Sequence, residues 1–224
     1  MAFCDEFIIV TNKDFQSIVE NQMKAFKGLT YRCIFEEEGK GTAAAVVLSS
    51  LQLPQSEMVF VVASDQLISG EKYKDCVLEA KALAMDGNIV TFGMDIVNPD
   101  IRYDYIKYSG NDIVDFISNP DTLEAMSFKS AGTYYINAGM YIYRNGDFLN
   151  EIAGYAPELY SSCLESYLEK QTKGNYIYYS STALEQITHV SIESILVNLN
   201  NKNKVVYCDF DWQEVGHFAR LKTE

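Results

Sequence analysis

The chain has 224 residues, and its content of 48% apolar and 22% charged residues is typical of a folded globular protein. Its formal net charge of −13 repels a nucleic-acid backbone, so we expect no nucleic-acid partner. The apolar stretch nearest the N-terminus, residues 7–10, is too short for a signal peptide or a membrane span, and we expect no membrane association. Five scattered cysteines without a Cys-x-x-C pair disfavour a disulfide framework or a zinc site and favour a reducing, cytoplasmic setting.

The first half of the chain alternates apolar strands with amphipathic helices. Apolar residues at spacings of three and four, such as Phe15, Ile18 and Phe26, predict the first helix. A later uninterrupted apolar run at 58–63 is typical of a strand inside a parallel sheet, and Thr42 is a plausible N-cap for the second helix. In chain order we expect strands at 6–11, 31–36, 58–63 and 88–94, and helices at 14–26, 42–53 and 72–86.

Beyond residue 101 the sequence pattern changes to short tyrosine-rich strands interrupted by Gly and Asn. This pattern indicates an antiparallel or mixed part of the sheet. The alternation of strands and helices predicts an α/β fold with a doubly wound, Rossmann-like mixed sheet. Without a repeat or a linker, we expect a single domain over residues 1–224. The remaining elements are expected as strands at 102–108, 112–117, 134–143 and 205–209 and helices at 151–170 and 190–198, with 174–179 unassigned.

Two glycine-containing segments could bind a ligand. Gly39, Lys40, Gly41 and Thr42 join a strand to a helix, where glycines let the backbone approach a ligand and the helix start offers N–H groups. Asn137, two residues before a Gly in a strand, could hold a sugar hydroxyl. The structural alternatives are a simple tight turn at the first segment and a β-bulge at the second.

Carboxylates follow two predicted strands and could hold a metal ion. Asp65 comes directly after the strand at 58–63, at the kind of sheet edge where open α/β folds bind ligands. The segment 209–216 carries three carboxylates, among them Glu214. Mg²⁺ takes one or two carboxylates together with substrate phosphates. A turn cap at Asp65 and a solvated acidic loop are the structural alternatives.

In their order along the chain, these segments resemble the sugar-1-phosphate nucleotidyltransferases, and most closely the mannose-1-phosphate guanylyltransferases (GDP-mannose pyrophosphorylases). The likeness extends from about residue 7 to residue 221 and implies the nucleotide-diphospho-sugar transferase fold. It rests on six runs, namely 39–46, Val61-Val62-Ala63-Ser64-Asp65-Gln66, Tyr103-Asp104-Tyr105-Ile106, Ile136-Asn137-Ala138-Gly139-Met140, Ser191-Ile192-Glu193 and Trp212-Gln213-Glu214-Val215-Gly216.

The resemblance implies roles for these residues and a set of substrates. The substrates would be a nucleotide or nucleotide sugar and a sugar 1-phosphate, with Mg²⁺ as a possible cofactor. By position, the nucleotide would be bound by Gly39, Lys40, Gly41 and Thr42, the sugar by Tyr105, Asn137 and Gly139, and the metal by Asp65 and Glu214.

The chain departs from the family pattern where the phosphates would bind. The family opens with a strand and a Gly-Gly-x-Gly-x-Arg-x-x-Pro loop, and neither has a counterpart here, so we expect a sheet that lacks its first strand. Asn119 stands where the motif Phe-x-Glu-Lys-Pro has its Lys, and Asp104 stands where the sugar turn has Gly. Each lost contact to a transferring phosphate lowers the rate by a factor of about 10² to 10³.

We therefore expect a mannose-1-phosphate guanylyltransferase-like protein that binds a nucleotide or nucleotide sugar and whose own activity is weak or absent. The unpaired sheet edge favours a homo-oligomer or a partner subunit. Two alternatives stay open. One is an active enzyme making GDP-mannose or a related nucleotide sugar, with the phosphate loop supplied by a partner. The other is a metal-dependent glycosyltransferase, for which Asp209-Phe210-Asp211 matches an Asp-x-Asp motif.

Overall fold

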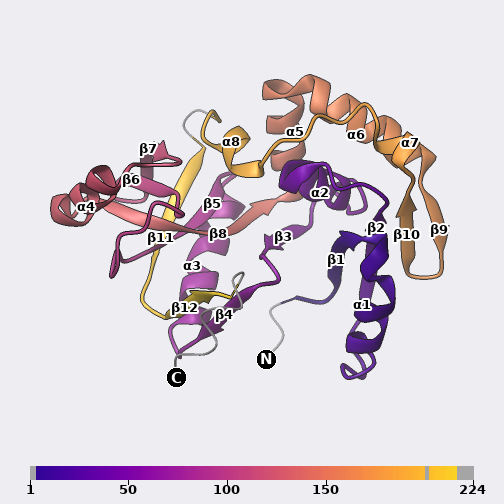
Figure 1. The fold of residues 1–224 in the computed structure, drawn as a ribbon, viewed down its shortest axis with the longest axis horizontal. Coiled ribbons are helices and arrows are strands. Elements are labelled where there is room, and N and C mark those ends of the chain that lie inside the picture. Colours follow the sequence, from indigo (N-terminus) through magenta and orange to yellow (C-terminus); the bar gives the residue numbers. More distant parts are fainter. Residues whose placement is uncertain (1–3, 200–201, 216–224) are drawn as a thin grey trace. The chain divides into compact units, whose positions relative to one another are not determined.

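The structure, a computed structural model, describes residues 4–199 and 202–215 and forms two compact units (Figure 1). Unit 1 is formed within Met1–Pro54 and Leu149–Ile195, and unit 2 within Gln55–Phe148 and Leu196–Glu224. Each unit has its own sheet and its own helices. The expectation of a single domain over residues 1–224 stays a prediction.

Unit 1 is built on a four-stranded sheet with the strand order β1-β2-β10-β9. The first three strands run parallel, and β9 is antiparallel to β10. The central strand β2 is rich in β-branched and aromatic residues and its Cys33, Ile34 and Phe35 are completely buried. The bounds are β1 (Phe7–Asn12), β2 (Tyr31–Glu36), β9 (Gln171–Lys173) and β10 (Tyr176–Tyr179).

Helices cover both faces of the unit 1 sheet. On one face, Gln16 of α1 donates a hydrogen bond to the hydroxyl of Tyr178 at 3.0 Å. On the other face, Gln52, just beyond α2, donates to the hydroxyl of Tyr179 at 2.9 Å. Neighbouring strand residues point to opposite faces, which places α1 and α2 on opposite sides. The helices are η1 (Lys13–Phe15), α1 (Gln16–Met23), α2 (Gly41–Ser50), α6 (Pro157–Glu169) and α7 (Ser181–Leu184).

Unit 2 has a six-stranded mixed sheet with the order β3-β8-β5-β11-β7-β6, and β8 also pairs with β6. This extra pairing closes five strands into a ring and leaves β3 outside it, paired with β8. A separate antiparallel pair is formed by β4 and β12, which lie side by side in Figure 1. The bounds are β3 (Met58–Val61), β4 (Gln66–Ser69), β5 (Ile89–Met94), β6 (Tyr105–Ser109), β7 (Asp112–Ile117), β8 (Tyr134–Arg144), β11 (Asn203–Cys208) and β12 (Asp211–Glu214).

The core of unit 2 lies between its sheet and α3 (Tyr73–Met85). Small side chains on α3, among them Ala80 and Ala84, let the helix approach Phe92 of β5 closely. A second helix, α4 (Thr122–Ala131), begins with a capping box between Asp121 and Glu124. Two further helices, α5 (Asn145–Tyr155) and α8 (Ile192–Leu196), span the boundaries between the two units in sequence.

The structure confirms an α/β fold with mixed sheets, but the expectation of a parallel third strand is wrong. β3 runs antiparallel to β8, and its four residues are only partly buried because it pairs with β8 at the end of the sheet. An apolar run of this length indicates burial but not the direction of the neighbouring strand.

Three helix predictions also need correction. The expected helix at 151–170 is two helices, since Pro157 starts α6 and a proline favours the first turn of a helix. The first helix ends at Met23 and is preceded by a 3-10 turn. Thr42 lies inside α2, and Lys40 is the N-cap residue. The sequence reasoning missed α4, α7, β4, β9 and β12, and the unassigned range 174–179 contains β10.

Among the described residues, no helix is both long and apolar enough to span a membrane. Gly216, the last residue of the sixth run that carries the family resemblance, lies outside the described residues.

Candidate functional site

The candidate nucleotide-binding turn of unit 1 depends on one glycine. Gly41 has a φ of +85°, and a Cβ atom there would lie 2.5 Å from the carbonyl oxygen of Val190. Both the left-handed backbone and the close approach require glycine. Gly39 differs, because no described atom lies within 4 Å of its Cβ position and the residue is exposed. The turn is therefore fixed by Gly41, and the space beside Gly39 is open.

The same turn is held against residues 190–192. The Ala43 N–H donates to the Val190 carbonyl at 3.2 Å, and the Ile192 N–H donates to the Thr42 hydroxyl at 2.9 Å. The Thr42 hydroxyl thus serves a distant segment and does not cap its own helix. Two of the runs that carry the family resemblance, 39–46 and 191–193, are brought together in this way.

Lys40 is not a free cation. Its Nζ lies 3.1 Å from Glu38 Oε2, and its side chain is only 14% exposed. Contact with a ligand phosphate would have to compete with this ion pair. The carboxylate therefore reduces the positive charge that the turn offers to an anion.

A buried carboxyl group, which the sequence reasoning missed, lies at the end of β2 just before this turn. Glu36 is 5% exposed, and its Oε1 has no hydrogen-bond partner among the described residues. Burial raises the pKa of Glu36 to about 7. Cys163 and Tyr179 lie close enough for this charge to affect their own titration, so Glu36 faces two groups that are neutral at pH 7.

In unit 2, the two candidate metal ligands come together from distant parts of the sequence. Glu214 is paired with Gln66 in the β4–β12 ladder, and the Val215 N–H donates to the Asp65 carbonyl at 2.7 Å. Asp65 and Glu214 are both exposed. No group of three His, Cys, Asp or Glu side chains in the described part of the chain is arranged to hold a metal alone. Binding of Mg²⁺ by Asp65 and Glu214 together with substrate phosphates stays a prediction.

Gln66 connects these carboxylates to the candidate sugar-binding segment. Its Nε2 donates to the Ala138 carbonyl at 2.6 Å, and its amide lies beside Gly139, which has a φ of +64°. That bond fixes the orientation of the amide. Its Oε1 is buried and has no hydrogen-bond partner among the described residues. Gln66 therefore places an unused acceptor beside Asp65 and Ala138.

Asn137 is held by other side chains in a defined orientation. Its Oδ1 accepts hydrogen bonds from the Gly139 N–H at 3.2 Å and from the Thr91 hydroxyl at 2.8 Å. Its Nδ2 donates to the Tyr141 hydroxyl at 3.1 Å. Asn137, Thr91 and Tyr141 are 7%, 3% and 2% exposed. One amide hydrogen of Asn137 is left without a partner in the described structure, so this residue offers a donor to a ligand.

The structural alternative for Asn137 also holds, because the residue begins a β-bulge. Along the β5–β8 ladder, Thr91 is opposite Tyr141 whereas Gly93 is opposite Asn137, so the register shifts between the two pairs. Gly139 supplies the left-handed residue inside this bulge. Bulges redirect side chains, and this one allows Asn137 and Tyr141 to contact each other within one strand.

The predicted sugar turn lies beside the same segment, but Tyr105 itself belongs to the core. The Asn137 N–H donates to the Asp104 carbonyl at 2.8 Å, and Trp212 packs near Tyr103 with ring centroids 5.8 Å apart. Tyr105 is completely buried, and its hydroxyl lies 2.9 Å from both the N and the O of Asp100. Contact between Tyr105 and a sugar stays a prediction.

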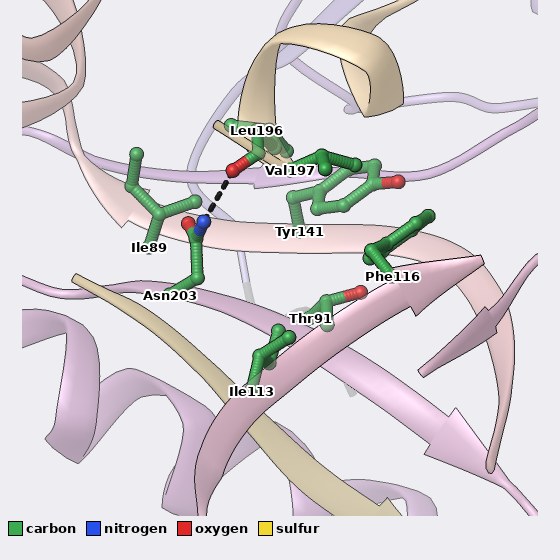
Figure 2. A pocket seen from close by; sticks show the side chains of 8 residues that line it. All are labelled: Ile89, Thr91, Ile113, Phe116, Tyr141, Leu196, Val197 and Asn203. Atoms are coloured by element: carbon green, nitrogen blue, oxygen red, sulfur yellow. Dashed lines mark hydrogen bonds between the residues drawn. The ribbon is translucent and has the colours of Figure 1, made fainter. Parts of the chain in front are cut away.

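Figure 2 shows an apolar pocket in unit 2. Thr91 and Tyr141, which orient Asn137, both line it, and Asn203 at its edge donates a hydrogen bond to the Leu196 carbonyl. None of its lining residues is charged, so the pocket does not suit a sugar phosphate. It is lined by Ile89, Thr91, Ile113, Phe116, Tyr141, Leu196, Val197 and Asn203.

The structure gives a local explanation for Asn119 and a partner for Asp209. Asn119 has a φ of +53°, the only left-handed residue other than glycine in the described chain, and asparagine tolerates this conformation well. Asp209 of the possible Asp-x-Asp motif forms an ion pair with Lys72. The first finding gives a local reason for Asn at this position. The second shows that one carboxylate of the motif already has a cationic partner.

Sequence reasoning missed three residues of the unit 2 site. Gln66 falls within a recognised run but has no acidic side chain, and Thr91 and Tyr141 lie in ordinary strand patterns. Their role depends on which strands become neighbours. The one available signal was the Asn-x-Gly spacing, which predicts a bulge and therefore polar neighbours that stabilise it.

Comparisons with known proteins show the family of this chain. The family model described as "Nucleotidyl transferase" matches residues 1–223. A mannose-1-phosphate guanylyltransferase of Escherichia coli (strain K12) is 26% identical over 97% of this chain and 49% of its own length. The alginate biosynthesis protein AlgA of Pseudomonas putida is 27% identical over 97% of this chain and 47% of its own length. The chain thus spans about half the length of these relatives.

Two solved structures share the fold. A mannose-6-phosphate isomerase from Helicobacter pylori is 28% identical, with a TM-score of 0.87 over 94% of this chain and 85% of that one. A structure described as mannose-1-phosphate geranyltransferase from Thermus thermophilus has a TM-score of 0.79 over 96% of this chain and 62% of that one. At 18% identity, the second likeness shows the fold alone.

Proposed function

Since the chain belongs to the nucleotidyl transferase family, we propose that it is a mannose-1-phosphate guanylyltransferase-like protein that binds a nucleotide or nucleotide sugar, with weak or absent activity of its own. The observation that carries the binding role is the convergence of Asp65, Glu214 and Asn137 around Gln66. These residues come from separate parts of the sequence, and each offers a group that a nucleotide sugar and its metal ion can use. The cysteine pattern favours a cytoplasmic setting.

Asp65 and Glu214 would hold Mg²⁺. A bound Mg²⁺ would neutralise the negative charge of the phosphates, which a chain with a net charge of −13 would otherwise repel. The two carboxylates suit this task because both are exposed and their backbones are adjacent. The phosphates supply the remaining oxygen ligands.

Asn137 and Gln66 would recognise a sugar hydroxyl. The free amide hydrogen of Asn137 is a donor and the free Oε1 of Gln66 is an acceptor. A hydroxyl group can accept one hydrogen bond and donate another. A site of this kind rejects a ligand that lacks the hydroxyl, because its own polar groups would then stay unpaired.

The proposal of weak activity rests on the charges within the described chain. Transfer of a nucleotidyl group requires cations or N–H groups around the phosphate oxygens. Asn119 occupies the position where the family pattern has a lysine, and Lys40 is paired with Glu38. One such missing contact lowers the rate by a factor of about 10² to 10³.

Binding is tested by thermal shift with GDP-mannose, with and without Mg²⁺. We expect a stabilisation that requires Mg²⁺ and that is lost in Asp65→Asn and in Glu214→Gln. Asp211→Asn is the matched control, since Asp211 is an exposed carboxylate on the same strand as Glu214. A folded chain that shows no shift with any nucleotide sugar would overturn the binding role. Loss of binding in Asp211→Asn alone would favour the glycosyltransferase alternative.

Activity is tested by pyrophosphate release with Mg²⁺, mannose 1-phosphate and each nucleoside triphosphate. We expect little or no turnover by the chain itself and a gain in Asn119→Lys, with Asn119→Gln as the uncharged control. Rapid turnover with GTP by the unaltered chain would show that other groups replace the lysine, and the chain would then be an active guanylyltransferase.

A further inference from the structure

The parallel strands of unit 1 bring the end of β2 to the edge of the sheet where open α/β folds bind ligands. β1, β2 and β10 run parallel, so Asn12, Glu36 and Tyr179 lie side by side at their carboxyl ends. The chain leaves β1 for α1 on one face of the sheet and leaves β2 for α2 on the other. Ligands bind at the carboxyl edge where successive connections change face in this way. The topology of unit 1 therefore supports a ligand at the turn of residues 39–42.

Three acidic residues follow one another at the end of β2, and they differ in their partners. Glu37 forms an ion pair with Lys13 at 2.7 Å, and Glu38 forms one with Lys40 at 3.1 Å. Glu36 is 5% exposed, and its Oε1 has no hydrogen-bond partner in the described part of the chain. Both lysines are thus already paired with other carboxylates. An ionised Glu36 adds a negative charge to this edge that neither lysine neutralises.

The groups that face the Glu36 side chain carry no charge at neutral pH. Burial, and to a smaller extent the Glu36 carboxylate, raises the pKa of Cys163 in α6 to about 12 and also raises the pKa of Tyr179 in β10. The neighbouring residue of β1 is Asn12, which does not titrate. α2 and α7, which pack against α6, contain no titratable side chain. The charge state of Glu36 therefore depends on the pH and on the charge of a ligand nearby.

We propose that binding of an anionic nucleotide at the turn of residues 39–42 is linked to protonation of Glu36, an inference that rests on the proposed nucleotide-binding role. Three residues of chain span at most about 11 Å, so a phosphate bound at Gly39 lies on the order of 10 Å from Glu36. At an effective dielectric constant of about 20, two negative charges at this distance repel each other enough to weaken binding about tenfold. Protonation of Glu36 removes this repulsion.

The linkage has a defined direction. Burial raises the pKa of Glu36 to about 7 in the free protein. A bound anion raises this pKa further, because its charge disfavours the ionised carboxylate. Binding therefore takes up protons, and the affinity falls as the pH rises from 6 to 8. We expect a dissociation constant about fivefold higher at pH 8 than at pH 6, and uptake of about half a proton per ligand at pH 7.5.

Isothermal titration of the complete chain with GDP-mannose and Mg²⁺ gives the first test. The diphosphate of this ligand does not change its charge between pH 6 and 8, and buffers of different ionisation enthalpy report the proton uptake. Equal affinity at both pH values, or an affinity that rises with pH, would overturn the linkage and leave the nucleotide-binding role standing. Absence of binding at every pH would overturn both.

Three variants assign the linkage to Glu36. Glu36→Gln should bind at pH 8 as tightly as the unaltered chain binds at pH 6, and it should take up no proton. Glu38→Gln is the matched control and should keep the pH dependence, since it removes the same charge from a 58% exposed side chain that has a lysine partner. His189→Gln is the second control, because histidine titrates in this range and His189 precedes Val190, which contacts the turn. Loss of the pH dependence in either control, or its persistence in Glu36→Gln, would overturn the proposal.

The charge state of Glu36 is also tested without a ligand. NMR of the glutamate carboxyl carbons should show one resonance that is absent from Glu36→Gln and that titrates near pH 7. Addition of GDP-mannose should move this titration to higher pH, because the bound anion stabilises the protonated carboxyl group. A Glu36 resonance that titrates near the ordinary value of 4.5 would overturn the proposal whether or not the chain binds a nucleotide.

Discussion

The two units hold their candidate site residues in different ways. In unit 1 the turn at 39–42 is fixed mainly by backbone, through the left-handed Gly41 and the bond from Ala43 to the Val190 carbonyl. In unit 2 Asn137 is fixed by the side chains of Thr91 and Tyr141. A backbone-built turn tolerates many side chains except where glycine is required. A site built from side chains changes with each of them.

The largest expected effect tests the backbone part of this comparison. Gly41→Ala should lower the free energy of unfolding by more than about 3 kcal/mol, because a left-handed Ala is strained and its Cβ would overlap the Val190 carbonyl. Gly39→Ala should change it by less than about 1 kcal/mol. Urea denaturation of both variants measures the difference. Equal losses would show that the turn is not fixed by Gly41.

The next prediction concerns Glu36, a buried side chain of unit 1 that lies just before the backbone-fixed turn at 39–42. Its pKa is raised from 4.5 to about 7, so the folded state binds the proton more tightly than the unfolded state does. Stability should therefore fall as the pH rises from 4.5 to 7 and stay lower above it. At 1.36 kcal/mol per pKa unit, the loss is up to about 3 kcal/mol.

Glu36→Gln removes this titration while keeping the size of the side chain. We expect the variant to match the unaltered chain near pH 4 and to be more stable at pH 8, as measured by urea denaturation at each pH. A stability difference that does not depend on pH would show that Glu36 stays charged when buried.

A smaller effect is expected from the side-chain network of unit 2. Thr91→Val keeps the shape of Thr91 but removes the hydroxyl that bonds Asn137, leaving a buried Oδ1 with one partner fewer. The expected loss is about 2 kcal/mol of unfolding free energy. The same variant should weaken nucleotide-sugar binding, measured by isothermal titration, because Asn137 is no longer held in one orientation. Unchanged binding would show that the Thr91 hydroxyl does not contribute to nucleotide-sugar binding.

The smallest effect comes from the corresponding hydroxyl of unit 1. Thr42→Val removes the acceptor of the Ile192 N–H, but Thr42 is exposed and water can replace the lost bond. We expect a loss of about 1 kcal/mol or less in urea denaturation. A loss larger than that of Thr91→Val would reverse the comparison between the two units.

The sequence by itself determined the local elements and the family. The strands at 31–36 and 112–117 have the expected bounds, because periodicity and turn residues are local properties. The six runs of residues that resemble the sugar-1-phosphate nucleotidyltransferases indicated the fold, which the structure and the comparisons confirm. They also identified Asp65, Asn137 and Glu214, whose segments the structure brings together in unit 2.

Only the tertiary structure decided which groups meet and which stay uncovered. Gln66 is paired with Glu214 across nearly 150 residues of sequence, and no local pattern encodes such a pairing. The antiparallel β3 and the buried hydroxyl of Tyr105 likewise follow from the order of strands. The apolar residues of η1 and α1 follow a helical pattern in the sequence, yet Phe15 and Ile18 are half exposed. A periodic pattern shows that a face is apolar, whereas the neighbouring elements determine whether anything covers it.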